Sequence, residues 1–321
     1  MPTFTRRLAL AAPALLVASP ALAFPERAIR LVSGFPPGGT NDIVARALAQ
    51  PLSQVLGQPV VVENRAGAGG GVAAGVVARA PADGYTLYLG IVDTQSINPL
   101  TYRRLAYDPE RDFAPVSLVT NIPFAIITGP AREDIRDIPG MIAAAKARPG
   151  DLTYASWGVG SSPHLAFLRL AQSEGFDMLH VPFNGPPAAV TAMLGRQVNF
   201  MMLGAGNAET FARDPRIRVL ATVGDQRLEM LPQVPTMKEL GFDLNMGLWQ
   251  ALYAPAGTPA PVIARLNAAA HEAMATPGFI AAMRTQGARP DPSTPEELLA
   301  LQRREREAYG VVVRSLNLVL D

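Results

Sequence analysis

Short apolar runs alternate with longer stretches of helical periodicity along this chain. Residues 29–33 (IRLVS) form a short apolar run, and from Ile43 to Leu56 apolar residues recur at helical spacing. Further short apolar runs follow at 60–62 and 86–90. Strands that alternate with helices in this way predict an α/β fold with largely parallel sheets.

The first helical stretch contains one residue that disturbs its pattern. Pro51 lacks a backbone N–H, and its ring clashes with the preceding turn of a helix. We therefore expect the helix to kink or to end early at this point. Gly57 stands where a residue that closes a helix belongs, directly after the last periodic residue.

Two longer apolar segments divide the chain into two units. Residues 116–128 are apolar and β-branched and can carry the chain into a second unit, and residues 248–254 can carry it back. The expected architecture is an α/β protein of two lobes, each a mostly parallel sheet flanked by helices. Lobe 1 is predicted to comprise residues 24–120 and 250–321, and lobe 2 residues 121–249.

Two glycine-rich turns, one in each predicted lobe, combine the end of a strand with the start of a helix. Residues 35–42 (FPPGGTND) follow the strand at 29–33, and residues 156–164 (SWGVGSSPH) follow the one at 152–155. Unpaired N–H groups and the positive end of the macrodipole lie at a helix N-terminus, and glycine lets a ligand approach the backbone closely. Two such turns predict that an anionic group is held between the lobes, which favours capture over catalysis.

The first 23 residues have the features of a secretory signal. Arg6 and Arg7 precede an apolar run at 8–17, and Ala21-Leu22-Ala23 fits a cleavage site. The run is too short to span a bilayer. We therefore expect cleavage after Ala23 and a periplasmic location, with a buried N-terminal helix as the alternative. The paired arginines leave open whether export uses the general or the twin-arginine route.

Charge and composition narrow the choice of partners and chemistry. The chain has 28 basic and 27 acidic residues without a basic run, which argues against nucleic acid as a partner. It contains no cysteine, which excludes disulfides, thiolate nucleophiles and cysteine-bound metals. Its three histidines are scattered and do not predict a zinc site. No metal and no cofactor is expected.

A third glycine-rich segment has the spacing of a nucleotide-binding motif. Gly69, Gly71 and Ala74 satisfy G-x-G-x-x-A. However, residues 63–66 separate this segment from the preceding strand, and an acidic residue suitably placed on a second strand is missing. A tight, close-packed turn is therefore favoured over a nucleotide site.

Serine and histidine lie close together in the second turn. Ser161, Ser162 and His164 raise the alternative of a hydrolase, but the chain has no G-x-S-x-G elbow and no acid evidently placed to orient His164. We expect no catalytic residue here, and we expect His164 to support the turn or to cap its helix. Trp157, in the same turn, is predicted either to cover the core or to stack on a ligand.

These motifs, in this order, resemble the Bug/TctC family of extracytoplasmic solute-binding receptors, which are associated with tripartite tricarboxylate transport. The resemblance extends over the whole mature chain and includes the signal. It rests on successive matching runs at 35–42, 59–65 (PVVVENR), 67–70, 83–87 (DGYTL), 97–99 (INP), 107–116 (YDPERDFAPV), 154–165, 180–183, 197–198, 231–236 (LPQVPT) and 254–259 (APAGTP).

The resemblance implies a type II-like periplasmic binding protein fold that closes on a small organic carboxylate. The implied partner is a set of membrane transporter subunits, with a sensor histidine kinase as the alternative, and we expect a monomer. Carried over by motif position, the ligand contacts would come from Phe35, Pro36, Gly38, Gly39 and Thr40 in the first turn, from Ser156, Gly158, Gly160, Ser161 and Ser162 in the second, and from Thr94. Trp157 is a further candidate.

The sequence departs from the family pattern at three positions. Leu203 stands where an acidic residue is frequent, Asn184 where lysine is common, and Trp157 where a small residue is usual. These changes favour an aromatic or weakly polar acid over ligands that bear amines or hydroxyls. The alternative from another class is an enzyme that acts on a carboxylate or ester through His164 or a carboxylate such as Asp42.

Overall fold

The computed structural model describes residues 24–244, 246–315 and 318–320, so the expected secretion signal at residues 1–23 lies outside the described part. Its strands are β1 (Ile29–Ser33), β2 (Val60–Asn64), β3 (Thr86–Ile91), β4 (Phe113–Thr128), β5 (Thr153–Ser156), β6 (Leu179–Pro182), β7 (Phe200–Gly204), β8 (Arg218–Thr222) and β9 (Gly247–Pro255). Its α-helices are α1 (Thr40–Leu56), α2 (Gly71–Ala78), α3 (Asn98–Thr101), α4 (Ile138–Ala147), α5 (Ser162–Glu174), α6 (Pro186–Leu194), α7 (Ala205–Phe211), α8 (Ala260–Met274), α9 (Pro277–Arg284) and α10 (Pro295–Ser315). Short turns of other helix types are η1 (Ala68–Gly70), the π-helical η2 (Asp93–Ile97) and η3 (Pro130–Arg132). None of the helices in the described ranges is both long and apolar enough to cross a membrane.

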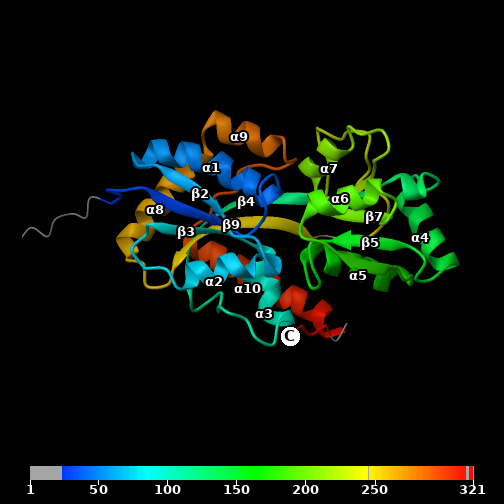
Figure 1. Ribbon diagram of the computed structural model, residues 1–321. Coiled ribbons are helices and arrows are strands. Elements are labelled where there is room, and N and C mark those ends of the chain that lie inside the picture. Colours follow the sequence, from blue (N-terminus) through cyan, green and yellow to red (C-terminus); the bar gives the residue numbers. More distant parts are fainter. Residues whose placement is uncertain (1–23, 245, 316–317, 321) are drawn as a thin grey trace, which may run out of the picture.

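The first lobe is built on a sheet with the strand order β2-β1-β3-β9-β4. β1 pairs in parallel with β2 and β3, whereas β9 runs antiparallel to β3 and β4. Helices α1, α8 and α9 lie on one side of this sheet, and α2 and α10 lie on the other (Figure 1). Because both faces are covered, β3 is buried along its whole length and reads as a continuous apolar run.

The second lobe continues the sheet in the order β4-β7-β5-β6, with β8 also paired to β4 (Figure 1). β5 pairs in parallel with β6 and β7, and β4 is antiparallel to β7 and β8. Both lobes therefore have a parallel core, as expected, and antiparallel strands at their junction. The result is a mixed α/β architecture.

β4 belongs to the sheets of both lobes. Its residues 113–123 pair with β9, and its residues 124–128 pair with β7 and β8. The two apolar segments expected to connect the lobes are thus confirmed as the strands β4 and β9. A single extended strand of 16 residues passes from one lobe to the other.

Helix α1 continues through Pro51, so the expectation of an early end is wrong. Pro51 is itself buried, and Leu48 and Leu52 on the same helix are fully buried in the core. Burial of this face outweighs the single backbone hydrogen bond that a proline removes. The helix ends at Gly57, whose φ of 68° is the left-handed conformation predicted for that position.

The glycine-rich segment after β2 is the tight turn that the sequence favours. Gly70 has a φ of 88°, and a Cβ on it would lie 2.8 Å from Cγ2 of Thr94 and 3.3 Å from the ring of Phe35. A Cβ on Gly34 would lie 2.9 Å from Cα of Gly70. The segment therefore packs against the start of the first glycine-rich turn and helps to fix it.

The N-terminus of α4 depends on one side chain, which gives a test of the fold. The Gly140 N–H donates to Oδ1 of Asp137 at 2.7 Å. Asp137→Ala should lower the free energy of unfolding by about 1 kcal/mol, since loss of an N-cap has this typical cost. Urea denaturation measures the change. Asp134→Ala, which removes an exposed ion pair with Arg132, is the control and should cost less; equal losses would contradict the capping role.

Candidate functional site

A pocket lies between the lobes, where strands of both lobes reach their carboxyl ends. Its cavity volume is about 30 Å³. Its lining comes from the first lobe through Phe35, Pro36, Gly39, Thr40, Asn41 and Ile91, from the connecting strand β9 through Leu248, and from the second lobe through Trp157, Pro186 and Pro187. The carboxyl ends of parallel strands are where α/β proteins generally bind ligands.

The structure brings only part of the predicted contact set to this pocket. Phe35, Pro36, Gly39, Thr40 and Trp157 line it. The other predicted contacts are not among its lining residues: Gly38, Thr94, Ser156, Gly158, Gly160, Ser161 and Ser162. The first turn therefore meets the pocket directly, whereas the second turn reaches it through its tryptophan.

The N-terminus of α1 opens into the pocket. The first main-chain hydrogen bond of this helix runs from the Ile43 N–H to the Gly39 carbonyl at 3.0 Å. The N–H groups of Thr40 and Asn41 come before it and have no acceptor within the helix. Both residues line the pocket, so the positive end of the helix dipole lies beside it.

Buried hydrogen bonds hold this helix start in place. The Asn41 amide donates to Oε1 of Gln250 at 2.9 Å and to the Leu89 carbonyl at 3.3 Å. Its oxygen accepts from Oγ of Ser33 at 2.7 Å. These bonds tie α1 to β1, β3 and β9 at once, so the first half of the site is preorganised within its own lobe.

Asp42 fixes the same turn through its carboxylate. It accepts hydrogen bonds from the Gly38 N–H at 3.0 Å, from Nε of Arg46 at 3.0 Å and from the Asn64 amide at 2.8 Å. Burial opposes ionisation, but these hydrogen bonds outweigh it and lower the pKa of Asp42 below its usual value. The carboxylate is therefore ionised and engaged within the turn.

One hydrogen bond joins the lobes beside the pocket. Oγ1 of Thr40 donates to Oδ1 of Asn207, in the first turn of α7, at 2.6 Å. A Cβ on Gly204, at the end of β7, would lie 3.0 Å from the same hydroxyl. The turn between β7 and α7 therefore closes directly on the first glycine-rich turn, a contact for which the sequence analysis gave no expectation.

Trp157 covers the core, which is one of its two predicted environments, and its stacking on a ligand stays a prediction. It is 7% exposed, and its ring centroid lies 6.0 Å from that of Phe124 in the core. It also lines the pocket. Its Nε1–H donates to Oδ2 of Asp93 at 3.3 Å, so the indole connects the second turn to the first lobe.

Most polar groups of the second turn bond within that turn. Oγ of Ser156 and Oγ of Ser161 both donate to the Gly158 carbonyl, at 2.8 and 2.7 Å. The Gly160 N–H donates to Nδ1 of His164 at 2.9 Å. The expectation that His164 supports the turn is thus confirmed.

Ser162 and Thr94 are also engaged by the protein itself. The N–H and the hydroxyl of Ser162 both donate to the carboxylate of Asp93. Thr94 is fully buried, accepts from the Tyr88 hydroxyl at 3.1 Å and donates to the Ile91 carbonyl at 3.1 Å. Their roles as ligand contacts remain predictions.

Two stacked histidines pack against the second turn. The rings of His164 and His180 have centroids 3.9 Å apart, and Nε2 of His180 lies 2.7 Å from Oγ of Ser156. Burial lowers the pKa of His164 to about 3, with repulsion from His180 adding to the effect, and burial lowers the pKa of His180 to about 4. Both rings are therefore neutral near pH 7, which leaves Nδ1 of His164 free to accept the backbone N–H.

Sequence reasoning missed half of the pocket lining, namely Asn41, Ile91, Pro186, Pro187 and Leu248. The two prolines follow Gly185 after β6, and a Cβ on Gly185 would lie 3.8 Å from the ring of Pro36. A Gly-Pro-Pro segment shortly after a strand and before a helix could have indicated this part of the pocket. Ile91 and Leu248 carry no such signal, because each is one of several apolar residues in its strand.

The other departures from the family pattern lie away from the pocket lining. Leu203 is fully buried in β7, opposite Ala125 of β4, and Asn184 is exposed. Of the three departures, Trp157 is the one that lines the pocket.

Two α/β lobes joined by extended strands, with a pocket between them at the strand ends, define a two-lobed solute-binding protein. The chain belongs to the family described as "Tripartite tricarboxylate transporter family receptor", which it matches over residues 44–318. The resemblance seen in the sequence is thereby confirmed.

Relatives match nearly the whole chain in sequence, and two of solved structure also share its fold. Protein BugT of Bordetella pertussis is 34% identical in sequence, over 91% of this chain and 90% of its own. The structure of R. palustris Rpa4515 with adipate has 28% identity and a TM-score of 0.88, covering 92% of this chain and 99% of its own. MatC from Rhodopseudomonas palustris with bound malate has 32% identity and a TM-score of 0.84, covering 90% of this chain and 100% of its own.

The histidine pair predicts how stability depends on pH. Both histidines have a pKa that folding lowers, so below about pH 6.5 the unfolded chain binds protons that the folded chain does not. The two histidines therefore do not lower the free energy of unfolding above pH 6.5, and they lower it increasingly as the pH falls toward 4. We expect the melting temperature to fall less between pH 7 and pH 4.5 in the double variant His164→Asn, His180→Gln than in the wild type.

The control for this measurement is His271→Gln, which removes a histidine from α8, outside the second turn. It should keep the pH dependence of the wild type. If the double variant and the wild type lost stability in parallel, the two stacked rings would not be the neutral pair described above.

Proposed function

We propose that this chain is an exported receptor that captures a small organic carboxylate between its lobes and delivers it to a tripartite tricarboxylate-type transporter. Lobe 1 comprises residues 24–120 and 250–321, and lobe 2 residues 121–249. The receptor acts as a monomer in the periplasm after cleavage behind Ala23. Its partners are the organic acid and the membrane subunits of the transporter.

The observation that carries this proposal is the pocket at the start of α1. Thr40 and Asn41 line it at the start of α1, where their N–H groups have no acceptor within the helix, and Trp157 and Pro186 cover it from the other lobe. A carboxylate at this helix start satisfies those donors and meets the positive end of the dipole. Its carbon skeleton then lies against the apolar side chains of both lobes.

The family and its solved members support the class of ligand. The family description names receptors of tricarboxylate transport, and two related structures are described with adipate and with malate. All of these are organic acids. The N-terminal signal pattern at residues 1–23 supports export, and it is independent of the pocket.

Closure completes the site because groups from the two lobes meet there. Thr40 contributes both to the pocket lining and, through its hydroxyl, to the bond with Asn207 of the other lobe. A ligand favours the closed form by the difference between its affinities for the closed and the open form. Thr40 is therefore the residue at which ligand binding and closure are coupled most directly.

Isothermal titration calorimetry with hexanoate, benzoate, adipate and malate tests the proposal. At least one of these acids should bind, and Thr40→Val should weaken its binding about tenfold, or about 1.4 kcal/mol, because the variant loses the hydroxyl bond across the lobes. Thr191→Val is the matched control: its exposed hydroxyl donates to the Pro187 carbonyl within α6, and binding should be unchanged.

Mass spectrometry of the protein purified under native conditions provides the independent measurement. It should reveal a co-purified organic acid in the wild type. If no acid of the panel bound and none co-purified, or if the ligand that did co-purify carried no carboxylate, the proposed function would be wrong.

A further inference from the structure

A carboxylate of the protein itself occupies the start of the second helix. The N–H and hydroxyl of Ser162, the first residue of α5, donate to Asp93, the hydroxyl at 3.2 Å. The Trp157 indole donates to the same carboxylate at 3.3 Å. Asp93 is 1% exposed and belongs to the first lobe, so it crosses the interface to fill the helix start of the second lobe.

The two helix starts of the site are therefore not equivalent. At α1, Thr40 and Asn41 line the pocket ahead of the first helical hydrogen bond. At α5, the Ser162 N–H already has an anionic acceptor. A ligand carboxylate that approaches the start of α5 therefore meets a charge of the same sign already bonded to Ser162.

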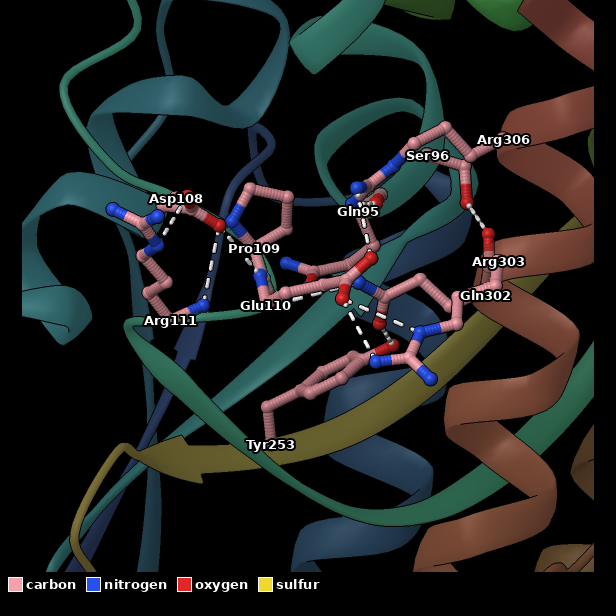
Figure 2. A network of polar contacts seen from close by, with 10 residues as sticks. All are labelled: Gln95, Ser96, Asp108, Pro109, Glu110, Arg111, Tyr253, Gln302, Arg303 and Arg306. Atoms are coloured by element: carbon pink, nitrogen blue, oxygen red, sulfur yellow. Dashed lines mark hydrogen bonds and ion pairs between the residues drawn. The ribbon is translucent and has the colours of Figure 1, made fainter.

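Asp93 is held in this position by its own segment. It begins η2, a π-helical turn, which is a rare geometry that often occurs at functional sites. Figure 2 shows how α10 anchors this turn: Oγ of Ser96 donates to the Gln302 carbonyl at 2.9 Å, and Arg306 donates to the Gln95 carbonyl at 3.3 Å.

Further contacts in Figure 2 hold α10 in place against the rest of the first lobe. Arg306 pairs with Glu110 at 2.9 Å, and Arg303 pairs with the same carboxylate at 3.0 Å. The buried Gln302 side chain bonds with the hydroxyl of Tyr253 on β9 at 3.1 Å. The segment that carries Asp93 is thus held by bonds within the first lobe.

The chemistry of the pocket is an independent observation that points the same way. Among the described residues, those that line the pocket include no charged side chain, and Phe35, Ile91, Trp157, Pro186 and Leu248 are apolar. An ionised carboxylate without a partner in such surroundings carries a large desolvation cost. The pocket therefore offers a place for one carboxylate at α1 and for an apolar body beyond it.

We infer that Asp93 is a specificity-determining residue that takes the place of a second ligand carboxylate and makes this receptor selective for monocarboxylates with an apolar body. The inference rests on the proposed function and adds to it the number of charges on the ligand. Discrimination arises because a diacid must either displace Asp93 from Ser162 or leave its second carboxylate unpaired. Burial raises the pKa of Asp93 to about 6, so the residue is ionised at pH 8.

A series of three ligands of similar length tests the inference. Hexanoate carries one carboxylate, adipate carries two, and 6-aminohexanoate carries a carboxylate and an ammonium group. Calorimetry on the full mature protein at pH 8 should show that hexanoate binds at least tenfold more tightly than either of the others. This comparison uses the wild type alone and so does not depend on the folding of a variant.

Two variants then assign the discrimination to Asp93. Asp93→Asn removes the charge at nearly constant volume, and Asp93→Gly also frees the start of α5; both should narrow the preference for hexanoate over adipate at least fivefold, Asp93→Gly the more. Asp243→Asn, which neutralises an exposed acid of the second lobe, is the matched control and should keep the wild-type preference.

Each possible outcome decides the question. Adipate binding as tightly as hexanoate in the wild type would overturn the inference and leave carboxylate capture intact. Tighter binding of 6-aminohexanoate would show that Asp93 receives a ligand ammonium instead. If folded Asp93 variants kept the wild-type preference for hexanoate over adipate, residues other than Asp93 would determine that preference, and the inference would be wrong. Failure of all carboxylates to bind would count against the proposed function itself.

Discussion

Each parallel strand that leads into a helix delivers N–H groups that the helix cannot satisfy, and this constraint shapes the whole interlobe region. Here the starts of α1 and α5 meet the interface from different lobes. Buried donors without an acceptor are costly, so each start needs an acceptor once the lobes are together. Asp93 supplies it at α5, whereas the start of α1 lies at the pocket, which Thr40 and Asn41 line.

Different side chains hold the backbone of the two glycine-rich turns, but both sets keep their turn ordered. At α1, a buried amide and an ionised carboxylate, those of Asn41 and Asp42, hold the backbone through hydrogen bonds. At α5, neutral histidine rings perform this task, since a protonated His164 could not accept the Gly160 N–H. Both turns are therefore ordered before a ligand arrives, and little binding free energy is spent on ordering them.

Local patterns predicted the features that depend on neighbours in sequence. The strand at 29–33, the helix end at Gly57 and the tight turn at Gly70 all follow from nearby residues. The end expected at Pro51 did not occur, because tertiary burial of α1 outweighs a local propensity.

Local sequence patterns could not predict the contacts between the lobes. Asp93 bonds to a residue 69 positions away, and Thr40 to one 167 positions away. The first turn could be assigned to the pocket because it is one contiguous segment. The partner that fills the second turn lies on another strand end of the other lobe, and no spacing rule links the two.

The bond between Asp93 and Ser162 also bears on how closure is controlled. Together with the bond between Thr40 and Asn207, it stabilises the contact between the lobes without a ligand. A closed form that is already populated in the empty receptor reduces the change in its population on ligand binding. Burial of the Asp93 carboxylate opposes this, since its raised pKa of about 6 reflects the cost of removing the charge from water. The desolvation cost of Asp93 therefore opposes the stabilisation that its bond to Ser162 gives to the contact between the lobes.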